Sequence, residues 1–287
     1  MTFRHLEIFL SVCDHKNMTH AAKDLYMSQP SVSQAISDLE AEYGVKLFER
    51  LNHRLYLTTS GERLQSYARH IINLSDQAKK ELSSQREGGS VRLGASLTTG
   101  TYLLPGVITS FSNQYPEVEV FTLVDNTNVI EQWILEDRID LGLVEGPILS
   151  TDIVQTHIRD DRLVVICAPG HPLSGRRKIA AVDLSGWKFI LREPGSGTRA
   201  IFEHAMRDAG VTWKIAGEYN NNESVKHGVM ADLGLGVVSS ISIEVEVKLN
   251  QLVPLVVRDL RLRRKFNLIY HRQKYFTKAM QALVEAF

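Results

Sequence analysis

Apolar residues follow two different periods along the chain. Over roughly the first 90 residues they recur at three- and four-residue spacings, the period of amphipathic helices. From Val91 onward they gather in short runs, such as VRLGAS and IDLGLVEG, that alternate with helical stretches. Such runs predict a mostly parallel sheet covered by helices. The sequence therefore predicts a helical N-terminal part and a larger α/β C-terminal part.

Two short helices are predicted in the segment AAKDLYMSQPSVSQAISDLE. The alanine pair that begins at Ala21 allows close backbone approach in the first helix, which is predicted to end near Leu25. Ser28 is a favourable N-cap, and Pro30 is tolerated in the first turn of a helix. The second helix is therefore predicted to start near Gln29.

The second helix has two chemically different sides. At about 100° per residue, one side carries the apolar residues Val32, Ala35, Ile36, Leu39 and Tyr43. The other side carries the short residues Pro30, Ser33, Gln34 and Ser37. Because Gln and Ser side chains pair with base edges, the pattern predicts a helix that lies in the major groove of DNA.

The order AA-x-x-L, SQPSVSQ-x-I-x-x-LE, G-x-x-LFER and LT-x-x-GE resembles the N-terminal signature of LysR-type transcriptional regulators, from Phe3 to about Leu64. The resemblance implies that the helix near Ser28 is the recognition helix and that a wing follows it. It implies DNA contacts from Gln29, Pro30, Ser31, Ser33, Gln34 and Ser37 on the helix, and from Arg50, His53 and Arg54 in the wing. Many family members carry a basic residue at the position of Gln34, so hydrogen bonding is expected to replace a phosphate contact here. The alternative is a generic helical bundle whose Ser and Gln side chains only keep it soluble.

Charge does not by itself predict DNA binding. Residues 1–60 contain six basic and seven acidic residues, and the whole chain has 33 of each. Affinity for DNA must then come from a few specific contacts and from the presence of two DNA-binding domains in a dimer.

A long amphipathic helix is predicted after the wing. Thr59 and Glu62 form a capping-box pattern at its start. The apolar stripe that follows comprises Leu64, Tyr67, Ala68, Ile71, Leu74, Ala78 and Leu82. Pairing of this stripe with a second chain would give a homodimer or homotetramer that binds a two-fold-symmetric operator in double-stranded DNA. The alternative is a helix that packs on its own domain.

The C-terminal part resembles the two-lobed effector domain of the same family, which is akin to type 2 periplasmic binding proteins. The expected architecture is an all-α winged helix-turn-helix domain (1–58), a linker and dimerisation helix (59–90) and an α/β effector domain (91–287). Lobe I is predicted over about 91–146 and 266–287 and lobe II over about 147–265, with crossovers near Glu145 to Pro147 and Leu260 to Lys265. A ligand is expected between the lobes.

Two stretches place hydroxyl groups at a predicted helix start just after a strand. They and their neighbours give the predicted effector site: Ser96, Thr98, Thr99 and Gly100 in lobe I, Glu145 at the crossover, and Gly195, Ser196, Gly197 and Thr198 in lobe II. Helix N-termini suit anions, and Arg199 adds a positive charge nearby. The alternative is ordinary helix capping by Ser and Thr. Together the two stretches predict an anion clamp.

The stretches ASLTTGTYLLP and EPGSGTR also resemble family members that regulate sulfur assimilation and carbon fixation, which implies a sulfur oxyanion or a small carboxylate or phosphate as effector. A neutral ligand or a protein partner is the alternative, and RNA polymerase is considered as a further partner. Enzymatic activity through Ser196, His204 and Glu193 has little support, because no strained nucleophile elbow surrounds the serine.

Other features of the chain add little chemistry. The basic run Arg258, Arg261, Arg263, Arg264 and Lys265 is predicted to be a solvated face. No cofactor or metal is implied, and Cys13 and Cys167 are interpreted as core residues. The sequence has no apolar stretch of about 18 residues and no export signal, so a cytoplasmic location without membrane contact is expected.

Overall fold

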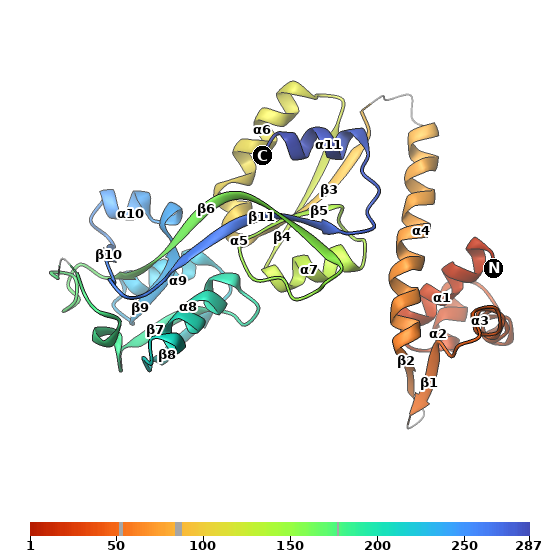
Figure 1. The fold of residues 1–287 in the computed structure, drawn as a ribbon, viewed down its shortest axis with the longest axis horizontal. Helices are drawn as coiled ribbons and strands as arrows, with labels where there is room; N and C mark the ends of the chain where they lie inside the picture. The colour runs from red at the N-terminus through yellow and green to blue at the C-terminus, as the bar shows by residue number, and fades with distance from the viewer. Residues whose placement is uncertain (52–53, 84–87, 177) are drawn as a thin grey trace. The chain divides into compact units, whose positions relative to one another are not determined.

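The computed structural model describes residues 1–51, 54–83, 88–176 and 178–287 (Figure 1). Its internal contacts divide the chain into two compact units, Met1–Glu87 and Gly88–Phe287. None of the described helices carries an apolar stretch long enough to span a lipid bilayer.

The N-terminal unit is built from helices and one hairpin. In chain order it contains α1 (Phe3–His15), α2 (Met18–Asp24), α3 (Gln29–Tyr43), β1 (Phe48–Leu51), β2 (Arg54–Leu57) and α4 (Thr59–Ser83). The two strands pair antiparallel as the predicted wing, with Leu51 opposite Arg54. The helix-turn-helix segment and its wing are therefore confirmed.

Helix α3 begins and packs as its sequence predicts. Ser28 is its N-cap and accepts a hydrogen bond from the Ser31 backbone N–H at 3.2 Å, and Pro30 lies in the first turn. The apolar residues that were expected to face the core are buried, namely Val32, Ala35, Ile36 and Leu39. Tyr43 is the exception, since 43% of it is exposed, because the helix ends there and Gly44 turns the chain with φ of 66°.

Helix α4 departs from two details of the prediction. Its N-terminal cap is Thr58 rather than Thr59, because the Thr58 hydroxyl accepts from the Gly61 backbone N–H at 3.0 Å. The apolar stripe also splits into two rows. Leu64 and Ala68 pack into the core of the N-terminal unit, whereas the second row is exposed and comprises Tyr67, Ile71, Leu74 and Ala78. The side chain of Leu82 lies outside the part of the chain that the structure describes.

The C-terminal unit alternates strands and helices. Its first part contains β3 (Ser90–Ser96), α5 (Leu97–Tyr102), α6 (Leu104–Gln114), β4 (Glu119–Asp125), α7 (Thr127–Leu135), β5 (Leu141–Val144) and β6 (Ile153–Cys167). Its second part contains η1 (Ala181–Leu184), β7 (Lys188–Arg192), α8 (Gly197–Asp208), β8 (Lys214–Tyr219), α9 (Asn222–Met230) and β9 (Leu235–Ser239). The chain then forms η2 (Ser240–Ser242), α10 (Glu244–Lys248), β10 (Val253–Leu255), β11 (Arg263–His271) and α11 (Lys278–Glu285).

These strands form one mixed sheet in the order β4-β3-β5-β11-β6-β9-β7-β8, with β10 added beside β6. Strands β3, β4 and β5 are parallel in lobe I, and β7, β8 and β9 are parallel in lobe II. The long strands β6 and β11 pair antiparallel from Ile153↔His271 to Arg162↔Arg263 and connect the lobes (Figure 1). The chain ends beside β3, where α11 buries Met280 and Leu283 in the same core as Leu93.

The first crossing between the lobes differs from its predicted place at Glu145 to Pro147. After β5 the chain stays in lobe I, starts β6 at Ile153 beside the C-terminal end of β11, and crosses only within β6. Residues 153–161 are rich in exposed polar side chains, since this part of the strand bridges two lobes, and they therefore lack the apolar run by which buried strands are detected. The predicted domain bounds at residues 58 and 90 stay a prediction.

Candidate functional site

Helix α3 presents a polar face to solvent. The predicted groove residues lie on it, with Gln29 and Ser33 half-buried and the others exposed, namely Pro30, Ser31, Gln34 and Ser37. Gln34 Nε2 donates to Asp38 Oδ1 at 2.8 Å, and the Ser28 and Ser31 hydroxyls lie 2.7 Å apart. The face therefore offers amide and hydroxyl groups, and an acidic neighbour one turn away holds the amide of Gln34.

The wing adds two positive charges to the surface of the N-terminal unit. Arg50 lies on β1 and Arg54 on β2, and both side chains are exposed. His53, the third predicted wing contact, lies outside the described residues. The described part of the hairpin therefore presents two arginine side chains to solvent.

In lobe I, the predicted hydroxyl groups have different roles at the turn from β3 into α5. Ser96 makes no side-chain cap bond; instead its hydroxyl lies 3.0 Å from that of Thr99. Thr99 donates to the Leu143 carbonyl of β5 at 2.7 Å, so this pair holds the turn against the sheet. Gly100 is required for packing, because a Cβ there would lie 2.9 Å from Val124. Among these predicted residues, Thr98 makes the hydrogen bonds that reach Arg264 and Asn222.

In lobe II, the turn from β7 into α8 approaches lobe I backbone to backbone. Ser196 makes no side-chain cap bond either, so ordinary capping does not explain the two serines. A Cβ on Gly197 would lie 2.4 Å from the Cα of Gly146, so the loop that follows β5 touches the start of α8. Gly195 has φ of 90°, a conformation that favours glycine. The contact between Gly146 and Gly197 needs a glycine at both positions.

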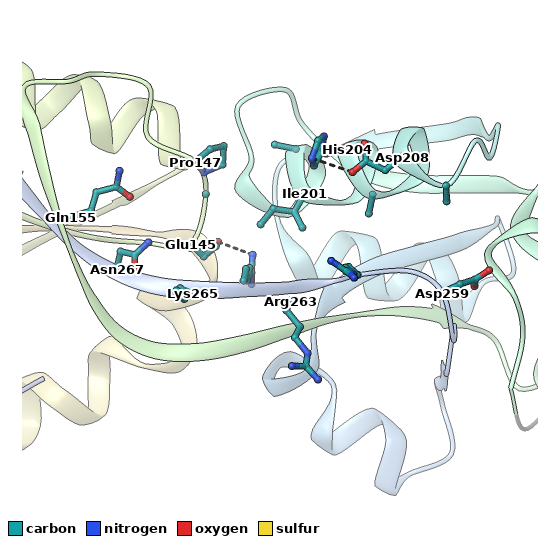
Figure 2. A pocket seen from close by; sticks show the side chains of 16 residues that line it. Glu145, Pro147, Gln155, Ile201, His204, Asp208, Asp259, Arg263, Lys265 and Asn267 are labelled. Carbon is teal, nitrogen blue, oxygen red and sulfur yellow. Dashed lines mark ion pairs between the residues drawn. The ribbon is translucent and has the colours of Figure 1, made fainter.

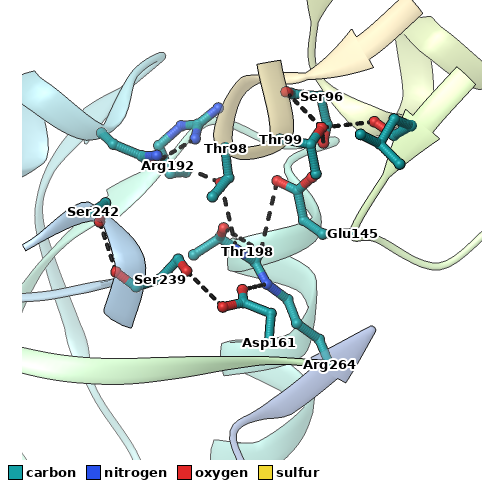
Figure 3. Close-up of polar contacts among 12 residues, drawn as sticks. Ser96, Thr98, Thr99, Glu145, Asp161, Arg192, Thr198, Ser239, Ser242 and Arg264 are labelled. Carbon is teal, nitrogen blue, oxygen red and sulfur yellow. Dashed lines mark hydrogen bonds and ion pairs between the residues drawn. The ribbon is translucent and has the colours of Figure 1, made fainter. Parts of the chain in front are cut away.

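Arg264 of β11 lies within contact of polar groups from both lobes (Figure 3). Its guanidinium donates to Thr198 Oγ1 of lobe II at 2.9 Å and to Thr98 Oγ1 of lobe I at 3.4 Å. Its Nε donates to Asp161 of β6 at 2.5 Å. The arginine side chain is 1% exposed. The prediction of a solvated basic face is therefore wrong at Arg264, whereas its neighbours Arg263 and Lys265 are exposed.

A second layer of polar groups supports Arg264 and Thr98. The Ser239 hydroxyl donates to the second oxygen of Asp161 at 2.7 Å. Asn222 lies 3.5 Å from the Thr98 hydroxyl and accepts from Arg192 NH1 at 3.0 Å. All of these side chains are buried, so the two lobes meet through a desolvated polar network in which each bond is stronger than it would be in water.

Glu145 completes this cluster, immediately after β5. Its Oε1 lies 3.6 Å from Arg264 NH1, and its side chain is 3% exposed. Its Oε2 is buried and has no hydrogen-bond partner among the described residues. Burial raises the pKa of the Glu145 carboxyl, and the positive charge of Arg264 opposes that shift.

An open space lies beside the cluster. A cavity of about 890 Å³ is bounded by the loop that carries Pro147, by Ile201 of α8 and by Lys265 of β11, and its wall includes Glu145 and Arg264 (Figure 2). Small-molecule sites commonly occupy concave spaces of this size between domains.

Three side chains near Thr198 have other partners. Arg199, expected to add charge for an anion, is bound to Glu203 at 2.7 Å and to Glu218 at 2.6 Å. His204 is exposed and lies 3.3 Å from Asp208, and Glu193 binds Arg192. The catalytic arrangement considered from the sequence is therefore not assembled.

The structure thus brings Thr98, Thr198 and Glu145 together around Arg264, while Ser96 and Thr99 hold their own turn. Sequence reasoning missed Arg264, Arg192, Asn222, Asp161 and Ser239. The sequence did contain an indication for Arg264. It falls in the same every-second-residue alternation along the strand as Leu262, Phe266 and Leu268, all of which are buried.

Comparison with known proteins agrees with this division of the chain. The profile of the LysR substrate binding domain matches residues 84–287, and that of the bacterial regulatory helix-turn-helix protein, lysR family, matches residues 3–62. The chain belongs to the LysR family of transcriptional regulators. The first match covers β3 to α11, and the second covers the helix-turn-helix and the wing.

Relatives of this LysR family regulator match it along nearly its whole length. It is 35% identical to the uncharacterized HTH-type transcriptional regulator YeiE of Escherichia coli K12, over 99% of this chain and 96% of the relative. It is 33% identical to the RuBisCO operon transcriptional regulator of Allochromatium vinosum, over 99% and 95%. The CcmR regulatory domain of Synechocystis PCC6803, solved in complex with 2-PG, superposes with a TM-score of 0.65 at 26% identity, over 68% of this chain and 94% of that one. This protein is thus a DNA-binding regulator with an effector-binding domain.

Proposed function

We propose that this regulator is switched by a small anion that binds between its two lobes. The observation that carries the proposal is the buried guanidinium of Arg264, which is hydrogen-bonded to Thr98 of lobe I and Thr198 of lobe II. An anion placed among these groups would receive charge-assisted hydrogen bonds from both lobes at once. The chemistry of the site favours a sulfur oxyanion, a phosphate or a small carboxylate.

Arg264, Thr98 and Thr198 are buried against one another, so an anion that replaces their mutual contacts requires the lobes to separate around β6 and β11. Binding would then replace contacts of Arg264 with Thr98 and Thr198 by contacts to the anion. A ligand shifts a conformational equilibrium only as far as it binds one state better than the other. The anion prefers the lobe arrangement that offers it both Thr98 and Thr198. The CcmR regulatory domain solved with 2-PG supports an anion in this fold.

On DNA, we propose that the α3 groove residues read base edges, whereas Arg50, Arg54 and His53 contact phosphates. The exposed row on α4 would pair with the same row of a second chain, because Tyr67, Ile71 and Leu74 recur at the four- and three-residue spacing of a helix pair. A homodimer or homotetramer on a two-fold-symmetric operator follows from that pairing.

The test is thermal unfolding of the full chain against sulfite, sulfate, thiosulfate, phosphate and common carboxylates, followed by DNA binding with and without the stabilising anion. A ligand that binds only the folded state raises the unfolding midpoint. We expect one class of anion to raise it by several degrees and to change DNA affinity. The absence of any shift while the chain still binds its own promoter DNA would favour a neutral effector or a protein partner.

A further inference from the structure

The clamp contains one carboxyl group whose hydrogen bonding is incomplete. Glu145 Oε2 is buried and has no hydrogen-bond partner among the described residues. A buried polar atom in this state lowers stability, so its persistence points to another partner. Because Glu145 and Arg264 both line the adjacent cavity, that partner can come from a ligand.

The charges that face Glu145 come from three strands and determine which partner fits. Arg264 of β11 and Arg192 of β7 are cationic, and Asp161 of β6 is anionic. Asp161 holds the Nε of Arg264 at 2.5 Å, whereas Glu145 lies 3.6 Å from the same guanidinium. Glu193 already neutralises Arg192 through two hydrogen bonds. An added anion would therefore meet a cluster whose positive charge is largely matched.

An anion next to an ionised Glu145 would be repelled, because both would be hydrogen-bond acceptors in a desolvated site. A protonated carboxyl removes the repulsion and provides a donor. Burial raises the pKa of Glu145 even before a ligand arrives.

We propose that Glu145 is protonated in the anion-bound state and donates its Oε2–H to the effector anion, so that binding takes up one proton from solvent. This inference rests on the proposed function. The carboxylate, a solvent proton and the anion combine into a neutral carboxylic acid hydrogen-bonded to the anion, and no covalent bond other than O–H forms. Effector sensing by this regulator is therefore coupled to pH, with tighter binding in acid.

The experiment is isothermal titration calorimetry of the full chain with sodium sulfate, in pairs of buffers that differ in heat of ionisation. Sulfate does not titrate near neutral pH, so proton uptake reports the protein. We expect uptake to approach one proton per anion, with the dissociation constant rising about tenfold per pH unit above the pKa of the free protein. Sulfate binding without proton uptake would overturn the proposal.

Glu145→Gln and Glu203→Gln form the matched pair of variants. Gln keeps a donor at position 145 but cannot titrate, so we expect proton uptake and pH dependence to disappear. Glu203 lies on α8, where it binds Arg199, and its replacement should leave the proton count unchanged. Unchanged uptake in Glu145→Gln would contradict the assignment. If that variant fails to fold, the number of protons that wild type takes up, measured in two buffers, still decides whether binding is coupled to protonation.

Failure of the proposed function gives a different result. If neither sulfate nor thiosulfate nor phosphate binds to wild type or to Glu145→Gln at any pH, both the clamp and the proton coupling are wrong. If phosphate binds but sulfate does not, the titration of phosphate itself also contributes to the measured proton uptake. Subtracting the uptake of Glu145→Gln from that of wild type removes this contribution. A zero difference then overturns only the role of Glu145.

Discussion

The two units of this regulator display their functional chemistry in opposite ways. On α3 the polar residues are exposed or half-buried and come from one short stretch of chain. In the effector unit the polar residues are buried and come from α5, β6, α8, β11 and the residue that follows β5, and they already bind one another. Ser and Arg side chains therefore serve an open surface in one unit, at Ser31, Arg50 and Arg54, and a closed network in the other, at Ser239 and Arg264.

This difference teaches where substitutions should damage stability and where they should damage only recognition. An exposed polar residue on a helix can be removed at little cost to folding. A buried ion pair that loses one partner leaves an uncompensated charge in a region of low dielectric constant. Substitutions in the two units should therefore separate DNA binding from stability.

The largest effect is expected for Arg264→Ala. The change leaves Asp161 and Glu145 without their cation, so the free energy of unfolding should fall by about 3–5 kcal/mol. Urea denaturation followed by circular dichroism measures the loss. The control is Arg263→Ala, at the exposed neighbouring position, which should change it by less than about 0.5 kcal/mol. Similar losses in the two variants would mean that Arg264 is solvated.

Gly197→Ala tests the backbone contact between the lobes. The new Cβ would lie 2.4 Å from the Gly146 Cα, so the lobes must move apart or the loop must shift. We expect a loss of about 1–3 kcal/mol and weaker stabilisation by anions, measured by thermal unfolding with and without sulfate. Gly106→Ala is the matched control, because a Cβ there meets nothing within 4 Å. A normal anion response in Gly197→Ala would show that the contact does not matter for closure.

Gln34→Ala tests the exposed polar face of α3. Loss of a base-edge contact should weaken specific DNA binding by about 1–3 kcal/mol while anion binding stays unchanged. Fluorescence anisotropy with promoter DNA and with a scrambled duplex measures the effect. Gln132→Ala is an unusually close control, since Gln132 makes the same bond to a carboxylate four residues later, at 2.7 Å. Equal effects of Gln34→Ala on both duplexes would indicate a phosphate role instead.

The helix-turn-helix could be predicted from sequence because its determinants are local. The Ser28 cap, Pro30 in the first turn and the buried side of α3 all lie within one continuous segment, so periodicity and capping are sufficient. Resemblance to a family extended this to the wing and to the lobes of the effector unit.

The clamp could be predicted only in part, because its centre depends on contacts between distant segments. Thr98 and Thr198 were found as hydroxyls at helix starts, but Arg264 joins them from 66 residues beyond Thr198 and 166 beyond Thr98. A run of five basic residues indicated a solvated face, and only the strand alternation of Leu262, Arg264 and Phe266 pointed inward. Charge density and strand register gave conflicting indications there, and register was correct.

The smallest effect is expected at the exposed rim of the cleft, for Tyr102→Phe. The Tyr102 hydroxyl of α5 donates to Glu223 of α9 at 2.9 Å, so it joins the two lobes as Arg264 does, but in contact with solvent. Removing it should lower the free energy of unfolding by about 0.5–1.5 kcal/mol at neutral pH, a fraction of the Arg264→Ala loss. Tyr275→Phe, at a tyrosine that is 61% exposed, is the control.

The pH dependence of this rim bond has a defined sign. Burial, with the hydrogen bond to Glu223, raises the pKa of Tyr102 to about 12, so the phenol stays a donor throughout the neutral range. Its contribution to stability should be fully present below the ordinary phenol pKa of about 10 and be lost as pH rises toward 12. Denaturation midpoints of wild type and Tyr102→Phe should therefore converge above pH of about 10. A constant difference would mean that the lobes are held by buried contacts alone, and that the rim contributes only packing.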